Sequence, residues 1–169
     1  MALISSRRQW KYDVFLSFRG EDTRLGFTTQ LYSALIGKGI LTFMDDAELE
    51  KGKSISPELL AAIEDSRCAI VILSRRYAYS SWCLDELVKI IQCMKELGQQ
   101  VLPVFYYGVN PSEVRHQRGR FELKWEHQVD VEVREHEEVY GKHEDRLNAW
   151  RAALTQVANL SGWDFKNDS

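Results

Sequence analysis

The sequence has few cysteines and no long apolar run. Cys68, Cys83 and Cys93 are spread over 169 residues without a CxxC pair. Three cysteines are too few for a disulfide framework, so we predict a reducing compartment, namely the cytoplasm or the nucleus. The longest apolar run covers residues 68–73, whereas a membrane-spanning helix needs about 20 apolar residues. No apolar segment follows the arginines within residues 1–10, so the sequence predicts neither secretion nor a membrane partner.

Phosphate-binding and metal-binding motifs are also missing. Neither GxGxxG nor GxxxxGK[ST] occurs, so the sequence contains no dinucleotide fingerprint and no P-loop. His127, His136 and His143 follow no metal-ligand spacing, and we predict no metal site. The formal net charge is −3, which makes nucleic acid an unlikely partner on electrostatic grounds. We expect the acidic stretch at residues 126–145 to be a solvated excursion, with a dedicated binding surface as the alternative.

The order of hydrophobic patterns predicts the fold class. Hydrophobic and charged residues make up 44% and 28% of the chain, which is typical of one globular domain. Periodicity predicts strands at residues 12–18, 40–44, 69–73, 101–106 and 160–165, and helices at residues 24–38, 56–65, 81–97 and 146–158. This alternation indicates an α/β fold with a parallel sheet. The run 69–73 is typical of a central strand, and Pro103 favours a place near the edge. Asp22 or Thr23 is expected to cap the first helix, and Ser56 the second.

Ligands of open α/β sheets bind beyond the carboxyl ends of the strands, so candidate site residues are expected in the loops there. A phosphoryl-accepting receiver is excluded, because the third strand ends in Ile72-Leu73-Ser74 without a carboxylate. Trp82 and Glu86 are four residues apart on one predicted helix, so the indole should contact the carboxyl group and raise its pKa. Alternatively, Glu86 only interacts favourably with the helix dipole. For Cys83, near the start of this helix, we expect a packing role or a place in the pocket wall rather than covalent catalysis.

Cations follow the first two predicted strands. Arg19 and Arg24 flank the start of the first helix, and Lys51 and Lys53 bracket Gly52 in the second long loop. Together with helix N-termini, these side chains could hold a diphosphate. The alternative is that they are ordinary surface charges.

Six segments resemble, in order, the motifs of plant Toll/interleukin-1 receptor (TIR) domains, the N-terminal signalling modules of plant immune receptors. They are YDVFLSFRGEDTR (12–24), TFMDD (42–46), SSWCLDEL (80–87), VFY (104–106), NPSEVR (110–115) and LSGW (160–163). The match extends from about residue 11 to residue 164. We therefore expect a tail at residues 1–10, a TIR domain at residues 11–165 and a tail at residues 166–169, without the final helix of the family.

The resemblance implies a flavodoxin-like fold, with a five-stranded parallel sheet of order 2-1-3-4-5 and helices on both faces. It marks Glu86 as the catalytic residue of an NAD-cleaving activity that depends on self-association. NAD+ is then the substrate, and no separate cofactor is expected. The residues expected to bind the substrate are Arg19, Gly20, Arg24, Lys51, Trp82 and Cys83. The loop at residues 45–54 resembles the family's BB loop, which packs against a neighbouring protomer. The residues expected in self-association are Thr29, Gln30, Asp46 and Gly52.

The implied function is NAD+ glycohydrolysis in plant innate immunity, releasing nicotinamide and ADP-ribose or a cyclised form of it. The implied partners are further copies of the chain, other TIR domains and immune receptors. Thr29 and Gln30 stand where plant members usually carry Ser-His, so we expect weak self-association of the isolated chain. The alternative function is a non-catalytic adaptor that acts through TIR–TIR contacts. A nuclease or nucleotide-cyclising role on nucleic acid is disfavoured by the net charge.

Overall fold

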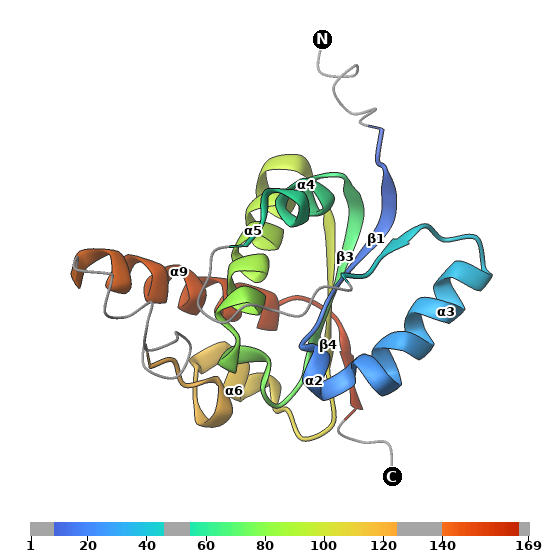
Figure 1. Cartoon of the computed structure of the whole chain (residues 1–169). Helices are drawn as coiled ribbons and strands as arrows, with labels where there is room; N and C mark the ends of the chain where they lie inside the picture. Colours follow the sequence, from blue (N-terminus) through green and yellow to red (C-terminus); the bar gives the residue numbers. More distant parts are fainter. Residues whose placement is uncertain (1–8, 46–54, 125–139, 166–169) are drawn as a thin grey trace.

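The computed structural model describes residues 9–45, 55–124 and 140–165. Five parallel strands form one sheet in the order β2-β1-β3-β4-β5, which confirms the predicted class and strand order (Figure 1). The strands are β1 (Tyr12–Ser17), β2 (Thr42–Phe43), β3 (Ser66–Leu73), β4 (Gln100–Phe105) and β5 (Trp163–Asp164).

The central strand is β3, which pairs with β1 on one side and β4 on the other. Its apolar run from residue 69 to residue 73 is buried, as the continuous hydrophobic pattern predicts. The two edge strands have only two residues each, fewer than the predicted 40–44 and 160–165. Short edge strands leave few unpaired backbone groups for another chain to join. Pro103 lies in β4, next to the edge strand β5, as expected.

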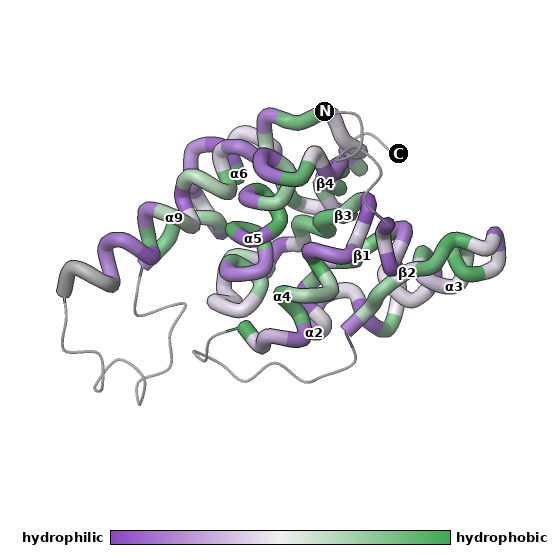
Figure 2. Tube along the Cα trace, turned by 90° about the horizontal axis from the view of Figure 1, so that it is seen from above, coloured by the Kyte–Doolittle hydropathy of each residue, from purple (hydrophilic) through white to green (hydrophobic). Residues whose placement is uncertain are grey.

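Helices cover both faces of the sheet. Among the described residues, the larger hydrophobic core and its helices cover one face, and α3 (Thr29–Gly37) covers the other (Figure 1). The helices are α2 (Gly20–Thr23), α3 (Thr29–Gly37), α4 (Pro57–Glu64), α5 (Ser81–Leu97), α6 (Pro111–His116) and α9 (Tyr140–Ala158). Hydrophobic segments concentrate along β1, β3 and α5, in the middle of the molecule (Figure 2). The larger core lies between the sheet and α4, α5, α6 and α9, and it contains the fully buried Trp150.

The first helical region differs from the prediction. It begins at Gly20 rather than near residue 24, and the backbone departs from helical geometry at Gly26 (φ −142°, ψ −108°) before α3 begins. Asp22 lies inside α2 and caps no helix. Thr23 occupies the N-cap position of the helical turn that begins at Arg24, as predicted, but its side chain makes no capping hydrogen bond. The Asp22 carboxylate accepts hydrogen bonds from β3-end residues instead, so a tertiary contact takes the place of the expected local one.

Other helix ends show how local signals act. Ser56 caps α4 by accepting a hydrogen bond from the Leu59 backbone N–H at 3.3 Å, as predicted. The short helix α6 was not expected from the hydrophobic pattern. Its signals are a capping Asn110, which accepts from the Ser112 backbone N–H at 2.9 Å, and Pro111 at the first helical position. Helix α9 begins at Tyr140, six residues before the expected start at residue 146.

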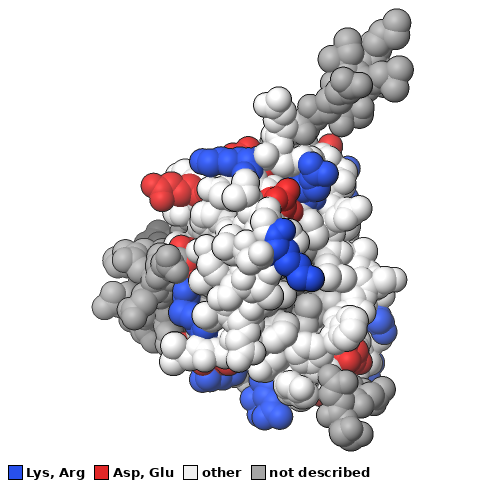
Figure 3. All heavy atoms as spheres, turned by 90° about the vertical axis from the view of Figure 1, so that its right-hand side faces the viewer, with Lys and Arg blue, Asp and Glu red and all other residues white. Residues whose placement is uncertain are grey.

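Most of the acidic stretch at residues 126–145, with His127 and His136, lies outside the described residues. On the face that carries α3, charges of both signs are scattered between uncharged areas (Figure 3). Of the helices that the structure describes, none is both long and apolar enough to cross a bilayer.

Candidate active site

Glu86 lies in the second turn of α5 and faces the carboxyl end of β1. The residue is 5% exposed, so its carboxyl group is buried. Ser17, the last residue of β1, donates its hydroxyl to Oε1 of Glu86 at 3.0 Å. Ser80 begins α5 as its cap and accepts from the Cys83 backbone N–H at 3.1 Å. The strand end and the helix cap together fix the position of the carboxyl group.

A second hydroxyl extends this contact. The hydroxyl groups of Tyr77 and Ser17 are 2.7 Å apart, and Tyr77 donates to the backbone carbonyl of Cys83 at 3.1 Å. Tyr77 and Ser17 are both fully buried. Each hydroxyl has one proton, so while Ser17 donates to Glu86 the Tyr77 proton is shared between Ser17 and the Cys83 carbonyl. The Glu86 carboxyl thus belongs to a short hydrogen-bond network that reaches the α5 backbone.

Burial raises the pKa of Glu86 from 4.5 to about 8. The hydrogen bond from Ser17 acts in the opposite direction, while the negative charges of Asp45 and Asp85 raise the pKa further. The Trp82 indole lowers it by a smaller amount, so the prediction that the indole raises this pKa is wrong. The carboxyl group is therefore mostly protonated at neutral pH, and an approaching cation would favour its ionised form.

The neighbouring residue, Asp85, ties α5 to α9. Its carboxylate accepts a hydrogen bond from the Trp150 indole at 2.9 Å and pairs with Arg146 at 2.7 Å. These contacts hold the first turns of α5 in place, and Glu86 with them.

Three buried donor atoms near the carboxyl end of β1 and the start of α5 have no hydrogen bond of standard geometry to a described residue. They are Nε of Arg19, Oγ of Ser81 and Nε1 of Trp82. The Trp82 indole is nonetheless near enough to Glu86 to affect its pKa, which agrees with the predicted contact between the two side chains. Buried donors usually have partners, and a polar ligand would supply them here.

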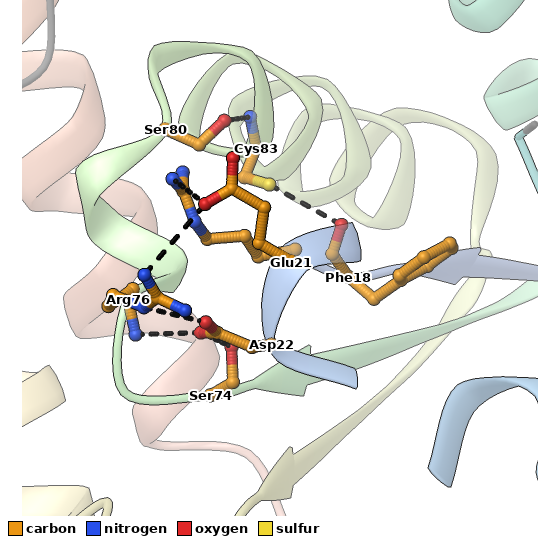
Figure 4. Close-up of polar contacts among 8 residues, drawn as sticks. Phe18, Glu21, Asp22, Ser74, Arg76, Ser80 and Cys83 are labelled. Atoms are coloured by element: carbon orange, nitrogen blue, oxygen red, sulfur yellow. Dashed lines mark hydrogen bonds and ion pairs between the residues drawn. The ribbon is translucent and has the colours of Figure 1, made fainter. Parts of the chain in front are cut away.

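Arg19 lies beside this region with its side chain 11% exposed. It donates to the carboxylate of Glu21 at 3.2 Å, and Glu21 also pairs with Arg76 at 3.8 Å (Figure 4). The positive charge of Arg19 lowers the pKa of the Cys83 thiol, against larger effects that raise it. The structure thus places a nearly buried cation close to the first turn of α5.

Arg24 is oriented differently. Its Nη1 donates to the backbone carbonyl of Asp45 at 2.8 Å, and its guanidinium lies 4.8 Å from the centre of the Phe18 ring. A Cβ atom at Gly20 would lie 3.0 Å from Nε of Arg24, so the glycine leaves room for this side chain. Arg24 therefore connects the start of α2 with the residue that precedes the long loop. Lys51, Asp46 and Gly52 in that loop lie outside the described residues.

Cys83 is fully buried, and its thiol donates to the backbone carbonyl of Phe18 at 3.5 Å (Figure 4). Burial and the nearby Glu86 carboxylate strongly raise the pKa of this thiol, so it does not form a thiolate at neutral pH. The predicted packing role is confirmed. A contact between Cys83 and a substrate stays a prediction.

Thr29 and Gln30 are exposed in the first turn of α3. The Thr29 hydroxyl donates to the backbone carbonyl of Arg24. Leu25, just before them, is fully exposed. These positions are accessible, and their role in self-association stays a prediction.

Sequence reasoning missed Ser17, Tyr77 and Asp22 as parts of this region. A signal existed for Ser17, because a hydroxyl at an inward position of a buried strand needs a hydrogen-bond partner. For Tyr77 and Asp22 the partners are 60 and 52 residues away along the chain, at Ser17 and Ser74 respectively. No local pattern reports contacts at that separation.

The family model described as "TIR domain" matches residues 11–169. The chain is 52% identical over 165 residues to Disease resistance protein RPV1 of Vitis rotundifolia, and 50% identical over 162 residues to TMV resistance protein N of Nicotiana glutinosa. These alignments cover 95% and 96% of the chain, but only 11% and 13% of the relatives' own length. Among solved structures, the TIR domains of the activated Roq1 resistosome align with a TM-score of 0.74 and 50% identity. That alignment covers 94% of this chain and 90% of the other.

Proposed function

The chain belongs to the TIR domain family, and on this premise we propose that it hydrolyses the bond between nicotinamide and ribose in NAD+. The observation that carries the proposal is the buried Glu86 carboxyl at the carboxyl end of β1. The Trp82 indole lies near this carboxyl group, and the cationic Arg19, whose buried Nε has no hydrogen-bond partner among the described residues, acts on Cys83 in the first turn of the same helix.

One carboxyl group is sufficient for this reaction. Hydrolysis of an ordinary glycoside uses two carboxyl groups, because a poor leaving group must be protonated. Nicotinamide leaves NAD+ as a neutral molecule from a cationic precursor, so no acid has to protonate it. The remaining requirement is to stabilise the positive charge that develops on the ribose.

Glu86 would provide that stabilisation. In its ionised form it would accept hydrogen bonds from the ribose hydroxyls, and its charge would interact more strongly with the transition state than with the substrate. The high pKa of the free carboxyl group means that the positive nicotinamide ring would itself favour ionisation on binding. Substrate binding and activation of the carboxyl group are then coupled.

The remaining residues would bind the substrate and exclude water. Arg19, Arg24 and Lys51 would hold the diphosphate, since guanidinium and ammonium groups pair with phosphate oxygens. Trp82 would shield the ribose from water. Gly20 would keep room for Arg24, as it does in the free chain, and Cys83 would form part of the wall.

Activity would require assembly. The similar relatives carry names of disease resistance proteins, and the similar solved domains come from a resistosome. These names support the proposal that the chain acts in plant immune signalling. We propose the cytoplasm or nucleus as its compartment, and copies of itself or other TIR domains as its partners. Thr29, Gln30, Asp46 and Gly52 would lie in the contacts between protomers. The products would be nicotinamide and ADP-ribose or a cyclised form of it.

A second candidate function is a non-catalytic adaptor that works only through TIR–TIR contacts. The hydrogen-bonded chain around Glu86 favours the enzyme, because a buried carboxyl group with a raised pKa reduces stability at neutral pH and is typical of functional sites. An adaptor would have no use for it.

Nicotinamide release from NAD+ at high protein concentration tests the proposal. We expect release by the wild type and by Glu96→Gln, a control on an exposed residue of the same helix. Glu86→Gln should fall to background while its circular dichroism spectrum matches the wild type. Equal release by the folded Glu86→Gln chain would contradict the assigned role. Absence of release by the wild type, alone and fused to an oligomerising partner, would favour the adaptor.

A further inference from the structure

A pocket lies at the carboxyl edge of the sheet, beyond the ends of β3 and β4. Its volume is about 390 Å³, which is within the usual range for small-molecule sites. Glu86 is not one of its lining residues, and within the described part of the chain none of them forms a hydrogen bond with Glu86. The pocket is therefore separate from the carboxyl group of the proposed active site.

One wall of this pocket is a fixed polar network. The Asp22 carboxylate accepts hydrogen bonds from the Ser74 hydroxyl at 2.6 Å and from the backbone N–H and Nε of Arg76, both at 2.9 Å (Figure 4). The other acidic residue of the wall, Glu21, pairs with Arg19 and Arg76. The negative charges of Asp22 and Glu21 are thus balanced by arginines, so these two carboxylates repel a bound anion only weakly.

Two more arginines line the pocket, and their charges are not compensated in this way. Arg75 and Arg120 are exposed, and neither forms an ion pair with a carboxylate of the described residues. The Arg75 guanidinium lies against Gly108, where a Cβ atom would collide with it. Gly108 also has φ +80°, a conformation that favours glycine. The glycine therefore holds space for Arg75 at the pocket.

Two tyrosines complete the lining. The rings of Tyr106 and Tyr107 are 5.2 Å apart, and Tyr107 lies 5.1 Å from the ring of Phe165. The ring of Phe27, two residues before α3, lies 5.5 Å from the ring of Tyr106. Tyr107 is 50% exposed although its ring is held by these neighbours. A supported, half-exposed ring is a surface on which a planar base can stack.

We propose that this pocket binds a purine nucleoside monophosphate. Arg75 and Arg120 bind the phosphate, since planar guanidinium groups match phosphate oxygens, and the base stacks on Tyr107. The net charge of the lining residues is positive, and the only acidic groups are paired, so a phosphate monoester is favoured over a cationic or neutral ligand. This proposal does not depend on NAD+ cleavage.

Titration calorimetry with 5′-AMP, adenosine and inorganic phosphate tests it. We expect 5′-AMP to bind the wild type and Arg67→Ala, a control at the exposed amino end of β3. Binding should weaken at least about tenfold in Arg75→Ala/Arg120→Ala, and about fivefold in Tyr107→Ala. Adenosine and phosphate alone should each bind at least about tenfold more weakly than 5′-AMP.

Three results would overturn the proposal. They are no binding of 5′-AMP by the wild type, unchanged affinity in the double arginine variant, and phosphate affinity equal to that of 5′-AMP. The second result would place the nucleotide elsewhere, and the third would exclude a role for the base. All substituted side chains are exposed, so the substitutions should leave the fold intact. Each variant should unfold at the same midpoint temperature as the wild type, which serves as the check on folding.

Discussion

Glu86→Gln should change how the stability of this chain depends on pH. In the folded chain the pKa of Glu86 is raised from 4.5 to about 8, chiefly by burial. Between these two values the folded state keeps a proton that the unfolded state has lost, so the free energy of unfolding falls as the pH rises. The stability contributed by the bound proton of Glu86 is fully present below pH 4.5, the ordinary pKa that applies in the unfolded chain. It is lost as the pH rises through about 8, the pKa in the folded chain.

The size of this effect follows from the shift. About 3.5 pKa units at 1.36 kcal/mol each give at most about 5 kcal/mol between the two ends of the range. Glutamine has nearly the same shape and stays neutral, and its carbonyl can still accept the hydrogen bond from Ser17. Glu86→Gln and the wild type should therefore be similarly stable near about pH 5. At about pH 9 the variant should be more stable by several kcal/mol.

Urea unfolding followed by tryptophan fluorescence measures this difference, with Glu96→Gln as the control. The control should follow the wild type, because its side chain is exposed on the same helix. Equal losses of stability in the wild type and Glu86→Gln between about pH 5 and about pH 9 would refute the reasoning, since the pH dependence would then arise from other groups.

Three further outcomes are expected. Ser17→Ala removes the hydrogen bond that lowers the Glu86 pKa, so NAD+ cleavage should begin at a higher pH, and stability should fall by about 1–2 kcal/mol in urea unfolding. Cys83→Ala should keep cleavage within about threefold of the wild type, and the folded wild type should expose no more than one thiol, Cys68, to a thiol reagent. The specific activity of the chain should fall on dilution, and fusion to an oligomerising partner should restore it, whereas a constant value from a monomer shown by light scattering would mean that one protomer holds a complete site.

Much of the fold follows from local patterns. Helix α5 has the predicted bounds because its apolar stripe, the Ser80 cap and Gly98 with φ +71° at its end all agree. The central strand follows from a run without polar residues. The prediction that Asp22 caps the first helix is wrong, because its carboxylate instead accepts hydrogen bonds from Ser74 and Arg76. A cap and a tertiary acceptor look the same in a single sequence.

The candidate site was only partly predictable. The spacing of Trp82 and Glu86 indicates a contact, because residues four apart share a helix face. The spacing cannot show that the Glu86 carboxyl group is buried, because its surroundings include Ser17 at the end of β1 and Tyr77 after β3. The large rise in the Glu86 pKa therefore needs the structure. The polar wall of the pocket beyond β3 and β4 also depends on ion pairs between residues far apart in the chain, such as Asp22 and Arg76.

The pH dependence of nicotinamide release from NAD+ tests the central claim most directly. It should be measured as kcat/KM at one high protein concentration, for the wild type and Glu86→Gln. If ionised Glu86 stabilises the developing charge, the wild-type rate should rise about tenfold per pH unit below about pH 8 and level off above it. Glu86→Gln should stay at background throughout. A wild-type rate independent of pH, or comparable release by Glu86→Gln, would contradict the account.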